Sequence, residues 1–123
     1  LDDGVHDLAE KRLTEIVEHT ARAYGCSADL TYKRNYPVMA NSEVETKYAA
    51  DAASKIAGSC NEAALVMGGE DFSYLLLARP GAYILVGNGD TSDVHNPDYT
   101  FSDEAIPYGC SWLVEMAESR LAE

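Results

Sequence analysis

The sequence predicts an α/β fold in which a layered α/β domain follows a smaller α+β unit. Three observations favour this class. Segments near both ends of the chain have the period of an amphipathic helix. A short segment at 28–33 alternates between apolar and polar side chains, as a half-buried strand does. The run at 82–86 is apolar on both faces, which is typical of an interior strand in a layered domain.

The first helix is predicted over residues 2–24, where apolar side chains recur at i, i+3 and i+4. Acidic residues suit its start, and Gly25 suits its end. The alternating segment 28–33 follows, and Pro37 ends it because proline cannot donate to a strand ladder. The residues expected on the buried stripe of the helix are Val5, Leu8, Leu13, Ile16, Val17 and Tyr24.

A second helix is predicted to begin at Ser42. With Glu45, this serine spells a capping box, in which each side chain satisfies a backbone donor of the other. Alanine dominates the apolar face, which allows close packing against a sheet, and Gly58 is a natural end. The apolar run at 64–67 then predicts a short buried strand.

Residues 72–77 predict a short helix, which Arg79-Pro80-Gly81 ends, and residues 82–86 predict the interior strand. A last helix is predicted from residues 102–104, with Pro107 in or near its first turn. The residues expected on its buried stripe are Ile106, Cys110, Leu113, Val114, Ala117 and Leu121.

The style of structure changes near residues 36–42. Residues 1–40 have the alternating burial of a small sheet-and-helix unit. Residues 41–123 have the fully buried strands of a layered α/β domain. We therefore expect a domain boundary between these two parts.

Composition excludes several classes of function. The formal net charge of −12 repels phosphate backbones, so nucleic acid is not an expected partner. No apolar run approaches the ~20 residues that a membrane helix needs, and no signal-peptide pattern opens the chain. Cys26, Cys60 and Cys110 lack CxxC spacing. We expect them to be small buried hydrophobic residues in a reducing compartment, which favours the cytoplasm.

His95 is the first candidate for chemistry. It follows the predicted interior strand in a loop, where a rigid scaffold often holds ligands. Neutral imidazole is a common zinc ligand, and Asp93 or Asp98 is placed to orient its second ring nitrogen. Asn96-Pro97 predicts a turn that aims the ring. The alternative is a structural histidine whose ring is satisfied by a backbone carbonyl.

The glycine-rich turn Gly68-Gly69-Glu70-Asp71 is the second candidate. Its glycines allow close approach, and backbone N–H groups at the start of the next helix can bind an anion such as a substrate carboxylate. The alternative is that the two acids stabilise the helix start through its dipole. The turn lacks the lysine of a phosphate-binding loop.

The other histidines and the potential nucleophiles give weaker indications of a functional site. His6 and His19 share no ligand spacing and are expected at the surface. No cysteine lies beside a histidine in an electropositive setting, so a thiol nucleophile is not expected. Ser73 has no nucleophile-elbow context and is expected to cap the start of a helix.

Together these segments resemble the carboxy-terminal part of the dinuclear zinc aminoacylase and carboxypeptidase family. The resemblance is to the branch of hippurate hydrolases, N-acyl-amino-acid amidohydrolases and plant hydrolases of auxin–amino-acid conjugates. It covers nearly the whole chain. The matching pieces are Asn35-Tyr36-Pro37, Asn41, Met67-Gly68-Gly69-Glu70-Asp71-Phe72-Ser73, Gly81-Ala82-Tyr83, Gly87, His95-Asn96-Pro97-Asp98-Tyr99, Phe101, Asp103-Glu104-Ala105 and Gly109.

The resemblance implies a two-domain enzyme with an α/β catalytic domain and an inserted ferredoxin-like lid that mediates homodimer formation. Residues 1–40 would be the closing helix and strand of the lid, and residues 41–123 the carboxy-terminal part of the catalytic domain. The implied cofactors are two divalent ions, zinc or else manganese, cobalt or nickel, with His95 as a metal ligand. The residues implied to line the pocket for a small N-acyl amino acid are Gly68, Gly69, Glu70 and Asp71.

The family's other metal ligands and its general-base glutamate have no counterpart in these residues. A zinc hydrolase needs about three protein ligands, an open position for water and a base. We therefore expect a fragment of a metal-dependent amidohydrolase that is inactive alone. The first residue is Leu1 rather than methionine, which processing and an excised fragment explain equally well. The alternative is a non-catalytic α/β binding or dimerisation module in which His95 is structural.

Overall fold

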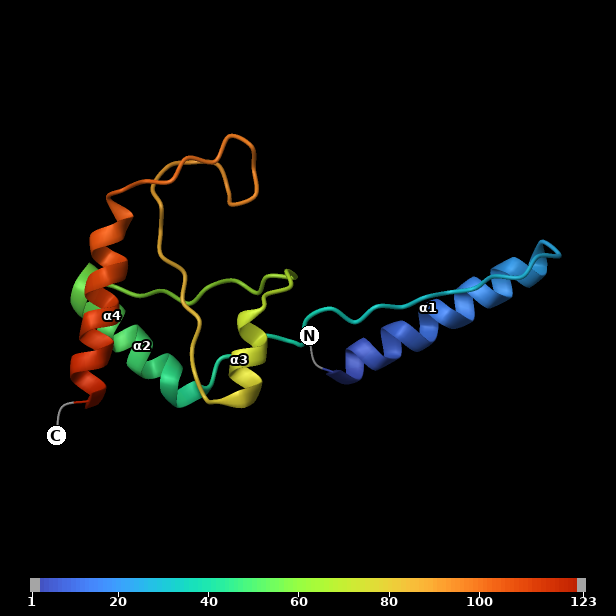
Figure 1. Cartoon of the computed structure of the whole chain (residues 1–123), viewed down its shortest axis with the longest axis horizontal. Helices are drawn as coiled ribbons and strands as arrows, with labels where there is room; N and C mark the ends of the chain where they lie inside the picture. The colour runs from blue at the N-terminus through green and yellow to red at the C-terminus, as the bar shows by residue number, and fades with distance from the viewer. Residues whose placement is uncertain (1–2, 122–123) are drawn as a thin grey trace. The chain divides into compact units, whose positions relative to one another are not determined.

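The computed structural model of the chain describes residues 3–121, which form helices joined by extended segments and loops (Figure 1). Helix α1 spans Asp3–Ala23, α2 spans Glu43–Ala57, α3 spans Phe72–Ala78 and α4 spans Ala105–Leu121. The sequence predicted a helix in each of these places, and those predictions are confirmed. None of the helices in the described part is long and apolar enough to cross a membrane.

Of the two predictions for the ends of α2, the one for its last turn is confirmed and the one for its first turn is wrong. Gly58 adopts the left-handed conformation with φ of 80° and donates its N–H to the Ser54 carbonyl, so the predicted stop is confirmed. The capping box is wrong, because the Ser42 side chain makes no capping hydrogen bond. Its hydroxyl instead accepts the N–H of Gly81 at 3.2 Å.

No β-strand occurs among residues 3–121, so the strands predicted at 28–33, 64–67 and 82–86 are wrong for this structure. A strand exists only where a second strand supplies the hydrogen-bonded ladder, and no described segment pairs with these three. The predicted burial of 64–67 is absent as well, since Leu65 is 99% exposed. The predicted sheet of the α/β class is therefore not formed here.

Very little of the described chain is buried. Of its apolar residues, only Ala49 and Ala52 are buried, and Ile16 and Leu113 on the stripes predicted for the first and last helices are 61% and 62% exposed. These predictions are wrong because no described element covers those helix faces. The cysteines were also predicted to be buried, and this prediction is wrong. All three are exposed: Cys26, Cys60 and Cys110.

The chain divides into two compact units. The first contains Leu1–Ala40 and Met67–Ala78, and the second contains Asn41–Val66 and Arg79–Glu123. The assignment of residues 1–40 to a lid and of residues 41–123 to a catalytic domain stays a prediction.

In the first unit, the chain after α1 runs back along the helix (Figure 1). Arg34 links the two, because its guanidinium forms ion pairs with Asp7, at 2.7 Å, and with Glu10. The side-chain hydrogen bond to Glu10, followed by that to Asp7, raises the pKa of Arg34 above its ordinary value, which keeps the group charged. All three side chains are substantially exposed to solvent, so the pairs contribute little stability.

In the second unit, α2 and α4 lie side by side (Figure 1). Ala49 and Ala52 of α2 are 1% and 5% exposed, and their small side chains allow a close approach. The indole N–H of Trp112 in α4 donates to the Ala49 carbonyl at 3.0 Å. The two buried alanines and this hydrogen bond lie at the small core of the unit.

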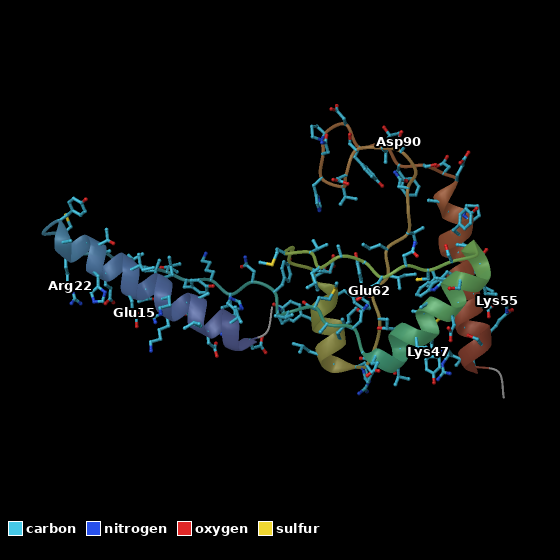
Figure 2. The ribbon with its side chains drawn as sticks, turned by 180° about the vertical axis from the view of Figure 1, so that it is seen from behind. Glu15, Arg22, Lys47, Lys55, Glu62 and Asp90 are labelled. Atoms are coloured by element: carbon cyan, nitrogen blue, oxygen red, sulfur yellow. The ribbon has the colours of Figure 1, made fainter. Side chains whose placement is uncertain are left out.

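Charged side chains border the same helix pair. Lys55 of α2 lies 2.7 Å from the Glu115 carboxylate of α4, and Figure 2 shows Lys55 on the part of α2 that lies against α4. The Arg120 guanidinium lies 3.7 Å from the centre of the Tyr48 ring. At exposed positions such contacts contribute about 1 kcal/mol or less each.

Candidate functional site

The glycine-rich turn at residues 68–71 belongs to the first unit and packs on an aromatic ring. A Cβ atom added to Gly69 would lie 2.8 Å from Cδ2 of Tyr36, a separation that only glycine avoids without a shift. The Tyr36 ring meets Tyr74 edge to face, with centroids 6.1 Å apart, and the Tyr74 hydroxyl donates to the Asn35 carbonyl at 2.6 Å. Two motifs far apart in the sequence are thus in contact.

Glu70 caps the start of α3. Its carboxylate accepts the Phe72 N–H at 3.3 Å, and its carbonyl accepts both the N–H and the hydroxyl of Ser73. The Ser73 side chain is fully buried, but its hydroxyl donates to a carbonyl and accepts no backbone N–H among the described residues, so the predicted cap by Ser73 is not formed. Asp71 is exposed, and its carbonyl accepts the Tyr74 N–H at 3.0 Å. The Glu70 carboxylate therefore stabilises the start of α3, and the role of the turn in binding an anion stays a prediction.

His95 belongs to the second unit and lies in a turn from Asp93 to Asn96. The Asn96 N–H donates to the Asp93 carbonyl at 3.1 Å, and His95 is the third residue of the four. Its φ of 70° is the only positive value outside glycine among residues 3–121. A positive φ in this place is that of a type II turn. For a residue with a side chain it costs about 1–3 kcal/mol, and such strain clusters at functional positions.

A second turn follows His95 at once. The Tyr99 N–H donates to the Asn96 carbonyl at 3.0 Å, and the Asp98 N–H donates to the Asn96 side chain at 2.9 Å. Pro97 stands at the second position, where its fixed φ favours a turn. The predicted turn at Asn96-Pro97 is confirmed.

The imidazole of His95 is exposed and makes no hydrogen bond within the described part of the chain. Neither Asp93 nor Asp98 orients the ring, and no backbone carbonyl satisfies it. No three His, Cys, Asp or Glu side chains among residues 3–121 gather where they could hold a metal ion. A zinc site takes about three or four protein ligands, and no such set is assembled among residues 3–121.

Asn88 links the two ends of the loop that carries His95 by hydrogen bonds. No motif in the sequence pointed to this residue. Its side-chain amide donates to the Thr100 carbonyl at 2.7 Å and accepts the Ser102 N–H at 2.7 Å. The Thr91 hydroxyl accepts the Thr100 N–H at 3.2 Å. The signal in the sequence is an asparagine between two glycines, which indicates a special backbone conformation but not its partners.

An open hollow in the first unit contains none of the site residues predicted from the sequence. It is bordered by the start of α1, by the segment around Tyr36 and by α3. The residues that line it are Asp3, His6, Asp7, Arg34, Asn35, Tyr36, Pro37, Tyr74 and Leu77. Its charged side chains include Arg34 and Asp7, which form an ion pair with each other.

Comparison with known proteins gives a consistent result. The profile of the family described as peptidase family M20/M25/M40 matches residues 3–119. The chain is 28% identical over 120 residues to an N-acetyl-L-cysteine deacetylase of Bacillus subtilis, with 98% of this chain and 29% of that protein covered. No solved structure gives a significant match.

Two further relatives have related names. The chain is 29% identical over 124 residues to the IAA-amino acid hydrolase ILR1-like 2 of Arabidopsis thaliana, with 93% of this chain and 28% of that protein covered. It is 31% identical over 101 residues to an N-acetyldiaminopimelate deacetylase of Exiguobacterium sibiricum, with 80% and 27% covered. The chain therefore spans less than a third of the length of these relatives.

Proposed function

Because the chain belongs to peptidase family M20/M25/M40, a family of hydrolytic enzymes, we propose that it is part of a longer metal-dependent amidohydrolase. The substrate class is a small N-acyl amino acid or a similar conjugate, whose amide bond the enzyme cleaves. The names of the deacetylases and the IAA-amino acid hydrolase support this class. The cytoplasm is the proposed compartment, and neither nucleic acid nor a membrane is a proposed partner.

The observation that carries the proposal is the placement of His95 within the matched residues 3–119. The turn holds this histidine in a rare backbone conformation, and its imidazole is exposed without a competing hydrogen bond. A ring in that state is available to donate a nitrogen lone pair to a metal ion. The structural alternative, a ring satisfied by a backbone carbonyl, lacks support.

The cofactor we propose is a pair of divalent ions, zinc or else manganese, cobalt or nickel. When bound, such ions supply Lewis-acid polarisation of the scissile carbonyl and of the attacking water. His95 holds one of them as a single ligand. The remaining ligands and the base carboxylate come from parts of the longer protein outside these residues.

The turn that contains Gly68, Gly69, Glu70 and Asp71 forms the proposed wall of the substrate pocket. The contact between Gly69 and Tyr36 fixes the backbone of this turn. Glu70 holds the start of α3, so its carboxylate serves the shape of the wall. We assign these residues to substrate binding and not to proton transfer.

The proposed whole protein also restores the sheet. The extended segments 28–33, 64–67 and 82–86 would pair there with strands from outside these residues, which gives the α/β class. Residues 1–40 would close a ferredoxin-like lid that mediates a homodimer, and residues 41–123 would complete the catalytic domain. The high exposure of Leu65 and Leu85, 99% and 68%, supports a covering by further chain.

The test is His95→Ala in the full-length protein. Loss of outer partners of a metal ligand already costs about 10–100-fold in affinity or activity, so loss of the ligand itself should lower turnover by about 100-fold or more. Metal content measured by elemental analysis should fall in parallel. His19→Ala, on the exposed face of α1, is the control and should change neither quantity.

Full metal content with wild-type kinetics in the His95→Ala protein would overturn the proposal. The rival reading, a non-catalytic α/β binding or dimerisation module, expects no metal and no turnover in either variant or in the parent. The two readings are therefore separated by the parent protein before any substitution is made.

A further inference from the structure

Side chains, rather than a backbone ladder, close the loop of residues 88–102. Among the described residues, no backbone-to-backbone hydrogen bond joins its outgoing limb, 88–91, to its returning limb, 99–102. Figure 1 shows the loop folding back on itself before α4 begins. A loop of this length would otherwise be free to change the direction in which its tip points.

Asn88 supplies the closure. Its Nδ2 donates to the Thr100 carbonyl and its Oδ1 accepts the Ser102 N–H, both at 2.7 Å. Because one planar amide makes both bonds, the distance and orientation between the two limbs are set together. The bond from the Thr100 N–H to Thr91 reinforces the same base at 3.2 Å.

We propose that Asn88 is a positioning residue for His95. Asn88 acts by joining residues 88–91 to residues 99–102 at the base of the loop, and it touches neither metal nor substrate. This inference rests on the proposed role of His95 as a metal ligand. A strained φ of 70° persists only where the surrounding chain holds it. Without the Asn88 amide, the turn relaxes and the imidazole leaves its coordinating direction.

Asn41 offers a matched control in the same unit. Its amide makes the same pair of bonds to another segment, donating to the Tyr83 carbonyl at 2.9 Å and accepting the Tyr83 N–H at 2.8 Å. Its loss removes as many hydrogen bonds as the loss of Asn88. It leaves the base of the His95 loop unchanged.

The experiment titrates Co²⁺ into the metal-free full-length protein and follows the visible absorption of the bound ion. We expect Asn88→Ala to raise the Co²⁺ dissociation constant about 10-fold, as the loss of a partner that orients a ligand does. Asn41→Ala should lower the melting temperature by about as much as Asn88→Ala does, but it should leave the Co²⁺ dissociation constant unchanged. A dissociation constant that Asn88→Ala and Asn41→Ala raise equally would overturn the inference, because it would show a general loss of structure.

Asn88→Asp is the second variant, in case Asn88→Ala does not fold. It keeps the acceptor for Ser102 and loses the donor to Thr100, while its added negative charge by itself favours a nearby cation. Weaker Co²⁺ binding by Asn88→Asp supports positioning, and equal or tighter binding overturns it.

His95→Ala separates this inference from the proposed function. If His95→Ala binds Co²⁺ as the parent does, the proposed function fails. If His95→Ala loses Co²⁺ but Asn88→Ala and Asn88→Asp both bind it normally, only the positioning role fails.

Discussion

Two of the candidate residues are subject to a local constraint: His95 has an unusual backbone conformation, and Gly69 has a close neighbour. His95 accepts a positive φ that most residues avoid, and Gly69 lies where a side chain would meet the ring of Tyr36. The Tyr36 ring, which meets Tyr74 edge to face, packs against the turn of Gly69. For His95, we propose that Asn88 holds the loop through its bond to Thr100. Each of the two candidate segments, taken by itself, is in contact with residues distant in the sequence.

Gly69→Ala should destabilise the full-length protein. The new Cβ would lie 2.8 Å from Tyr36 Cδ2, so the ring or the turn must shift, and overpacking of this kind costs about 1–3 kcal/mol. Urea unfolding measures the change in the free energy of unfolding. Gly87→Ala is the control, because its Cβ would meet nothing within 4 Å. It should stay within about 0.5 kcal/mol of the parent.

A double variant sharpens that experiment. If the contact with Tyr36 causes the loss, Gly69→Ala should cost much less in a Tyr36→Ala background, because the clashing atom is gone. Equal losses in both backgrounds would show that the clash is not the cause.

The helix pair α2 and α4 is the best-packed element of the described chain. Ala49 and Ala52 are buried because α4 comes close to α2, and Trp112 completes the contact through the Ala49 carbonyl. The small side chains are a requirement of this geometry, since a larger side chain has no room between the helices. The sequence indicated the alanine face correctly, but the predicted partner, a sheet, is wrong, because the helix α4 covers this face among the described residues.

Ala49→Leu should lower the free energy of unfolding by about 1–3 kcal/mol, because extra methyl groups must enter a packed interface. Ala49 is only 1% exposed. Thermal melting followed by circular dichroism checks the effect. Ala57→Leu, at the exposed last residue of α2, is the control and should have an effect near zero. Similar melting temperatures for the two variants would contradict the packing of α2 on α4.

Taken whole, the described chain carries far more exposed apolar surface than a monomeric protein usually does. Val66, Leu75 and Leu121 are 77%, 60% and 80% exposed. The net charge of −12 opposes association by repulsion, but salt screens that repulsion and leaves apolar contact unchanged. The surface thus favours contact with further chain of the same protein.

The 123-residue chain, prepared alone, should therefore self-associate, and more strongly as salt is raised. Sedimentation velocity over a range of concentrations measures this. Leu113→Glu, on the exposed face of α4, should shift the distribution toward the monomer, since Leu113 is 62% exposed. A monomer at every concentration and salt level would contradict the expectation.

The features that could be predicted from the sequence are those whose hydrogen bonds close within a few residues. Helices α1 to α4, the Gly58 stop and the turn at Asn96-Pro97 are of this kind, because each donor finds its acceptor three or four positions away. Family membership also followed from local motifs at recognisable spacing, and the profile match over residues 3–119 bears it out. The site residues themselves, His95 and the turn at 68–71, stay predictions.

The remaining features depend on distant partners, and there the sequence was silent or misleading. Alternation at 28–33 and the apolar runs at 64–67 and 82–86 indicate candidate strands. A ladder also needs a neighbouring strand, and the described residues contain none. Burial of the helix stripes fails for the same reason, since an apolar face is buried only when another element covers it. The contact of Tyr36 with Gly69 and the fastening of the His95 loop by Asn88 join residues that no local pattern relates. They arise because folding brings separate segments within hydrogen-bonding and van der Waals distance.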